Sequence, residues 1–212
     1  MPGKNIYRVG TDGTANYSTL EAIPSAILAQ GDTSILLFPG TYTALTNAVM
    51  SDIAFIGVGD REEIVISGDT TIANTSSGTI SFENLTITGS DANAALSTAC
   101  VTKLGAASTP LAFKGVTFNN AAIAVAHNGE RAFATTTKQV TLTLCDASAV
   151  DRSIVANANV TVSFSELNSS SNAYFTPGTG GGSAEVTITV LASTSGGANT
   201  GNCTKTVKAL LT

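Results

Sequence analysis

Residues 80–87 read ISFENLTI, and residues 111–118 read LAFKGVTF. Both follow one template: apolar and small residues alternate, two bend residues follow, and an apolar residue opens a short second strand. LTLCDASA (142–149) and VSFSELNS (162–169) share this template with a variable last place, and ITVLASTS (188–195) keeps its first half. ILLFPGTYT (35–43) and IAFIG (53–57) are looser, earlier copies. Alternation with a period of two indicates strands with one buried face. Repeats at this spacing indicate a chain that coils and stacks on itself.

The template predicts an all-β fold, a single-stranded right-handed parallel β-helix, because a two-residue bend turns the chain without reversing it. Inward side chains of successive rungs should then stack in columns. The first predicted column is Phe55, Phe82, Phe113, Leu144 and Phe164, and the second is Leu85, Val116, Ala147 and Leu167. The alternative is an antiparallel sandwich, which needs tight hairpins between consecutive strands. Asn128-Gly129 lies in a polar stretch and not between two matched strands, so the β-helix is favoured.

Composition narrows the classes of partner. The 212 residues carry 12% charged residues and a net charge of −5, with no run of Lys or Arg. This argues against nucleic acid or an anionic membrane as a partner. The first ten residues contain no apolar core of signal-peptide length, so we expect synthesis in the cytosol. Cys100, Cys145 and Cys203 are an odd number at unrelated spacings, which favours free thiols over disulfides or a metal site.

The stretch from Ser18 to Gln30 predicts a helix that covers the open end of the β-helix. Ser18 and Glu21 match a capping box, and Gly31 can end the helix. Pro24 should kink this helix or divide it into two short turns. We therefore expect one structural domain in three parts: an N-terminal strand and capping helix (1–33), the β-helix rungs (34–195) and a C-terminal tail or cap (196–212).

The opening stretch VGTDGTANYSTLEAI (9–23), followed by FPGTY (38–42) and the rungs, resembles the pectin-lyase-like superfamily. That superfamily contains pectin methylesterases, polysaccharide lyases and many bacteriophage tailspike and virion proteins. The resemblance implies the β-helix fold and leaves the function open, because the scaffold carries many tasks. Pectin methylesterase chemistry is expected to need glutamines, two aspartates and an arginine. Gln30 and Gln139 precede no aspartate motif of that type, so no catalytic role is carried over.

One pair of carboxylates offers an alternative enzyme site. In the template, Asp146 and Glu166 occupy the same bend position of consecutive rungs, which would stack them about 5 Å apart. Stacked carboxylates can act as acid and base, and Arg152 could join them. A polysaccharide-binding or polysaccharide-cleaving protein is therefore the alternative function.

Two other motifs favour structural interpretations. His127 lies in the polar stretch AHNGERA, which predicts a surface loop and not a catalytic base. The glycine-rich GTGGGS (178–183) lacks the Lys-Ser/Thr ending of a phosphate loop and predicts a turn. The sequence predicts no metal site and no cofactor.

The outward template positions are small and uncharged. They are Ser81, Ala112, Thr143, Ser163 and Thr189 on the first strand, and Thr86, Thr117, Ser148 and Asn168 on the second. A flat, weakly polar wall suits packing against another surface, whereas catalysis needs converging charge. Thr and Ser also simply fit exposed strand positions.

Within the superfamily that the chain resembles, these features imply a structural bacteriophage virion protein and not an enzyme. A capsid decoration (cement) protein on the virion surface is the specific expectation. The resemblance further implies a homotrimer, with the major capsid protein or another virion protein as its partner.

Overall fold

The computed structural model describes most of the N-terminal two thirds of the chain and selected strands of the rest. The described residues are 5–11, 13–91, 99–104, 109–121, 123–127, 138–147, 152–156, 160–165, 168–169, 175–177, 184–190 and 203–209.

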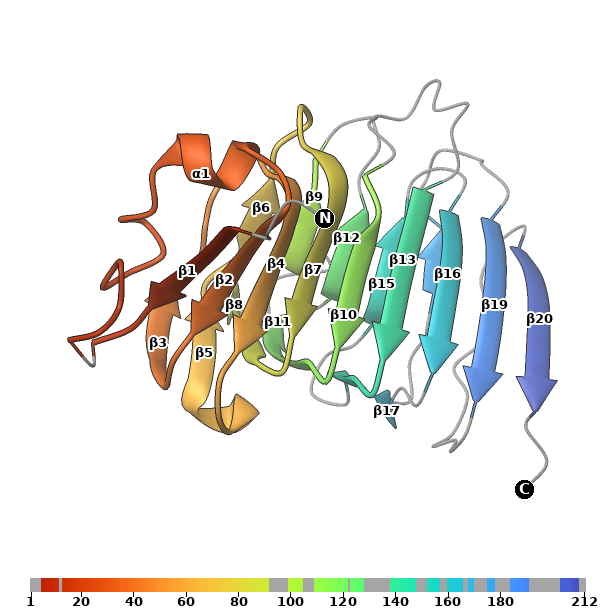
Figure 1. Cartoon of the computed structure of the whole chain (residues 1–212). Helices are drawn as coiled ribbons and strands as arrows, with labels where there is room; N and C mark the ends of the chain where they lie inside the picture. The colour runs from red at the N-terminus through yellow and green to blue at the C-terminus, as the bar shows by residue number, and fades with distance from the viewer. Residues whose placement is uncertain are drawn as a thin grey trace.

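The described strands form three parallel sheets that wrap around one interior (Figure 1). Sheet A contains β1 (Asn5–Val9), β2 (Thr33–Leu37), β4 (Ser51–Gly57), β7 (Ser77–Glu83), β10 (Leu111–Lys114), β13 (Lys138–Thr143), β16 (Val160–Ser165), β19 (Ala184–Val190) and β20 (Cys203–Ala209). Sheet B contains β3 (Gly40–Thr43), β5 (Ile64–Ser67), β8 (Thr86–Asp91), β11 (Thr117–Ala121), β14 (Asp146–Ala147) and β17 (Asn168–Ser169). Sheet C contains β6 (Thr70–Ile72), β9 (Ala99–Lys103), β12 (Ile123–His127), β15 (Arg152–Ala156) and β18 (Phe175–Pro177).

The chain visits sheets A, B and C in turn and then enters the next strand of sheet A, as the order β4, β5, β6, β7 illustrates. Each pairing between the described strands is parallel. These two observations confirm the right-handed parallel β-helix. The antiparallel sandwich is wrong, because the described consecutive strands either enter different sheets or, as with β1–β2 and β19–β20, pair in parallel and not as hairpins.

The corner between sheets A and B depends on one residue with left-handed backbone. Asn84, Gly115 and Leu144 occupy equivalent places in three successive rungs, with φ angles of 52°, 63° and 55°. A single residue at positive φ redirects the strand without a hairpin, and Gly and Asn tolerate that conformation best. The Asn84 side chain also links its corner to the preceding rung, since its Nδ2 donates to the carbonyls of Gly57 and Gly59 at 3.1 and 2.9 Å.

The interior contains the predicted aromatic column. The rings of Phe55, Phe82 and Phe113 stack at centroid distances of 5.2 and 5.4 Å, and all three side chains are buried. This part of the prediction is confirmed. Register matching places one ring directly beside the next, because Phe55 pairs with Phe82 and Phe82 pairs with Phe113.

The next member of this column is Leu142, and the prediction of Leu144 is wrong. Phe113 pairs with Leu142, whose side chain is 0% exposed, whereas that of Leu144 is 48% exposed. The third repeat therefore starts at Val140. A shift of two residues preserves the alternation of a strand, so the pattern alone could not distinguish the two alignments.

The same shift corrects the second column. Cys145, 2% exposed, follows Leu85 and Val116, which are both fully buried. Ala147, the predicted member, is also buried but lies two residues after Cys145. Leu167 lies outside the described residues.

The N-terminal cap differs from the expected helix. The helix α1 covers only Ser25–Ala29, with Pro24 at its N-cap, and residues 18–23 form bends and turns. The capping box of Ser18 and Glu21 therefore does not begin a helix, because Pro24 fits the start of a helix and not its interior. The cap still buries apolar side chains, since Leu20, Ile23 and Leu28 are at most 5% exposed.

A short segment of the cap also occupies the outer edge of β1. Arg8 N donates to Asn16 Oδ1 at 2.8 Å, and Arg8 O accepts from Asn16 N at 2.8 Å. Gly10 N donates to Tyr17 O at 3.0 Å. These bonds satisfy backbone groups that an open sheet edge would leave free to pair with another chain.

Replacing Leu144 tests the strained corner. We expect Leu144→Asn to raise the free energy of unfolding by about 1 kcal/mol, because Asn adopts positive φ more readily than Leu. Leu144→Ala is the matched control, since it removes the exposed side chain but keeps the left-handed strain. Urea unfolding measures both variants. An equal gain in both would contradict the backbone explanation.

Candidate functional surface

The structure describes two of the three residues of the alternative enzyme site. Asp146 is half-buried in β14 of sheet B, and its register partner on the next rung is Asn168. Glu166 lies outside the described residues, and Arg152 begins β15 of sheet C. The predicted stacking of Asp146 over Glu166 is therefore wrong, and its cause is the same two-residue shift of the third repeat.

The histidine and the glycine-rich motif have different outcomes. His127 is the last residue of β12 and not part of a loop, and Lys103 and Ala156 are its register neighbours. GTGGGS (178–183) lies outside the described residues.

Sequence reasoning missed Lys103. This lysine is 0% exposed, and its Nζ donates to the Leu104 carbonyl at 2.7 Å. The alternation of apolar and polar residues predicts that a lysine in a strand faces outward. It therefore gives no sign that Lys103 is buried.

The described part of the chain contains no cluster of three or more His, Cys, Asp or Glu side chains placed to hold a metal ion. None of its helices is long and apolar enough to cross a membrane.

The outer face of sheet A carries a column of small residues, which we call the small-residue column. Ser81, Ala112 and Thr141 are register partners on β7, β10 and β13, and each is partly or fully exposed. The register continues this column through Ser163 and Thr187 on β16 and β19. The predicted members Thr143 and Thr189 face the same way but belong to the neighbouring column, with Lys114 and Ser165.

The predicted wall on sheet B is not open. Thr86 is 6% exposed, and its hydroxyl donates to the carbonyl of Arg61 at 3.0 Å. Arg61 belongs to the short helix η1 (Arg61–Glu63), which contacts β5 and β8. Thr117 is half-buried beside Asp146, and Ser148 lies outside the described residues. The candidate contact surface is therefore the outer face of sheet A.

The N-terminal end of this face is apolar. Ile6 is 59% exposed and Val58 is 38% exposed, and Leu36 and Ile56 are half-buried register partners. The guanidinium of Arg8 lies over the ring of Phe38, 4.8 Å from its centroid. The sequence contained a signal for this surface, because continuous apolar runs such as ILLF and IAFI place apolar residues on both faces of a strand.

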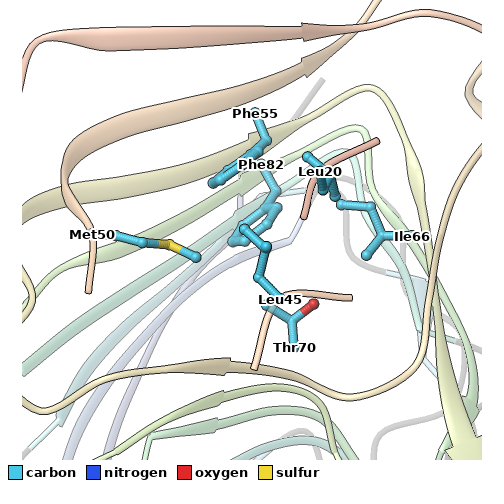
Figure 2. A pocket seen from close by; sticks show the side chains of 7 residues that line it. All are labelled: Leu20, Leu45, Met50, Phe55, Ile66, Thr70 and Phe82. Atoms are coloured by element: carbon cyan, nitrogen blue, oxygen red, sulfur yellow. The ribbon is translucent and has the colours of Figure 1, made fainter. Parts of the chain in front are cut away.

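The core contains a buried hydroxyl without a hydrogen-bond partner. Figure 2 shows the side chains that meet around it: Leu20, Leu45, Met50, Phe55, Ile66, Thr70 and Phe82. The space between them is too narrow for a water molecule. Thr70 Oγ1 is buried and has no hydrogen-bond partner. The core therefore carries the cost of one unpaired polar group.

Thr70 and its neighbour Thr71 provide a matched test. Thr70→Val should raise the free energy of unfolding by about 1 kcal/mol, because it replaces an unpaired buried hydroxyl with a methyl group. Thr71→Val should lower it by about 1 kcal/mol, because Thr71 Oγ1 accepts from Asn47 N at 2.6 Å. Thermal and urea unfolding measure both. A loss of stability in Thr70→Val would contradict the unpaired hydroxyl.

Cys100 and Cys145 are buried free thiols, as predicted. Burial raises the pKa of Cys100 to about 12 and that of Cys145 to about 11, above the ordinary value of 9.0. Cys100 Sγ lies 3.3 Å from the Asn119 carbonyl, and Cys145 Sγ lies 3.4 Å from the Thr143 carbonyl. Both thiols therefore stay protonated at neutral pH and are poor nucleophiles.

Alkylation and alkaline unfolding test this protonation. With iodoacetamide at pH 8, peptide mass spectrometry should find Cys100 and Cys145 modified only after unfolding. Their raised pKa values stabilise the fold fully below pH 9, and this contribution falls as the pH rises from 9 toward 11 and 12. Cys100→Ala should flatten the fall in stability above pH 9. Modification of either thiol in the folded protein would contradict the burial.

Comparison with known proteins adds no relative. No protein-family model matches the sequence, and no curated protein or solved structure shows significant similarity to it.

Proposed function

We propose that this chain is a structural bacteriophage virion protein that decorates the outer capsid shell. The observation that carries the proposal is the small-residue column on sheet A, in which Ser81, Ala112 and Thr141 lie side by side on successive rungs. Short uncharged side chains let a second protein surface approach a sheet closely. The partner is the major capsid protein or another virion protein, and no catalytic chemistry is required of the chain.

Two further features support the proposal. The first is the parallel β-helix, which suits a rod lying along a shell, because one face extends over many rungs. The second is the resemblance of the opening residues to the pectin-lyase-like superfamily, which includes virion proteins. The homotrimer stays a prediction. A polysaccharide-binding or polysaccharide-cleaving protein using Asp146 and Glu166 stays the alternative, although the register pairs Asp146 with Asn168.

Removing the protein from the phage and adding it back tests the role. Particles that lack the protein should still assemble but lose surface density and release DNA at a lower temperature. Purified protein should rebind such particles and restore heat resistance. Asp146→Ala/Glu166→Ala protein should rebind equally well, whereas Ser81→Glu/Ala112→Glu protein should bind at least tenfold more weakly.

Other outcomes of the same experiment would overturn the proposal. Absence of the protein from purified virions would contradict a structural role. Normal rebinding by Ser81→Glu/Ala112→Glu protein would contradict the contact surface. Cleavage of a polysaccharide that disappears in the Asp146→Ala/Glu166→Ala protein would favour the enzyme alternative.

A further inference from the structure

Four outward residues at the N-terminal end of sheet A form a second column, which we call the charged-apolar column. Register matching aligns Arg8, Leu36, Ile56 and Glu83 across β1, β2, β4 and β7. Their strand neighbours Ile35, Phe55 and Phe82 are at most 1% exposed. Alternation therefore turns the charged-apolar column toward the outside. It lies on the part of sheet A marked by β1, β2, β4 and β7 in Figure 1.

Along these four rungs the column is positive, apolar, apolar and negative, and the register continues it to the exposed Lys114 of β10, one rung beyond Glu83. Arg8 is exposed and rests on the ring of Phe38, and Glu83 is half-buried. Neither side chain forms an ion pair with another of the described residues. Two unpaired opposite charges therefore flank a pair of apolar side chains at intervals of one rung, about 4.8 Å.

The neighbouring outward column permits close approach. Its members Ile6, Ser34, Ala54 and Ser81 are uncharged. Ser34 and Ala54 are 4% and 5% exposed, so Ile6 and Ser81 are the members of this column that present surface to a partner. A second sheet can therefore come near the charged-apolar column without meeting a long side chain other than Ile6.

We propose that two copies of this chain pair face to face through the charged-apolar column. The two-fold axis lies in the interface, parallel to the strands and between β2 and β4, so the two β-helices run antiparallel. Reversal of the column sets Arg8 opposite the partner's Glu83, and Leu36 opposite the partner's Ile56. The sequence of charges is thus self-complementary, as an isologous contact requires.

The charges also select the orientation. With the two β-helices parallel, a two-fold axis along them would set Arg8 opposite the partner's Arg8 and Glu83 opposite the partner's Glu83. Like charges at both ends oppose that arrangement. A contact of four rungs is smaller than a standard interface, so the dimer should depend on concentration and weaken with salt. This inference goes beyond the proposed function and departs from the homotrimer that the resemblance implies, because it names a single second copy as the occupant of one end of sheet A.

Charge reversal with mixing tests the contact. Sedimentation of the wild-type chain at low salt should show a monomer–dimer equilibrium. Arg8→Glu and Glu83→Arg should each raise the dimer dissociation constant at least tenfold, because each sets like charges opposite one another. A one-to-one mixture of these two variants should recover the dimer, and so should the double variant, because opposite charges again face each other.

The control and the contrary outcomes are specific to this face. Glu63→Arg changes the same charge on the exposed helix η1 and should leave the dissociation constant unchanged. Circular dichroism establishes that each variant is folded. A wild-type chain that stays monomeric at millimolar concentration, a concentration-independent trimer, or a mixture that fails to recover the dimer would each overturn the inference. If the wild-type protein forms this dimer but does not rebind phage particles, only the proposed function is overturned.

Discussion

The parallel hydrogen-bond ladder between rungs is the constraint on which the rest of the structure depends. A strand in this arrangement satisfies its backbone groups only when another strand lies above it and below it in register. Register then decides which side chains meet, and it brings Phe55, Phe82 and Phe113 into one stack. The left-handed residue at the corner preserves this register, because it redirects three successive rungs in the same way, at Asn84, Gly115 and Leu144.

The ladder also creates the problem of the open end. At the N-terminus, Asn16 and Tyr17 bind the free backbone groups of Arg8 and Gly10, while Leu20 enters the interior beside Phe55 and Phe82. The cap therefore pairs the free backbone groups of β1 and also covers the apolar interior at the N-terminal end of the β-helix. A helix over the whole stretch from Ser18 to Gln30 is not needed for this. Pro24 limits α1 to Ser25–Ala29.

The outer faces differ in what they offer a partner. Sheet B is covered where η1 meets Thr86, whereas sheet A keeps small residues that are at least partly exposed on β7, β10 and β13. The rungs from β1 to β7 carry the charged-apolar column, which includes Arg8 and Glu83, and the small-residue column runs from Ser81, also on β7, to Ala112 and Thr141. The two proposals therefore assign different partners to neighbouring parts of one face.

The sequence by itself determined the architecture: the alternation and the bends predicted a parallel β-helix, its aromatic column and the free thiols Cys100 and Cys145. It could not determine alignment within the third repeat, because Leu142 and Leu144 are both apolar and share the same parity. Only the tertiary structure decided that choice, since pairing with Phe113 buries Leu142 and leaves Leu144 at the corner. The same alignment paired Asp146 with Asn168. Only the register of β1, β2, β4 and β7 brought Arg8, Leu36, Ile56 and Glu83 into one column, because register joins residues far apart in the chain.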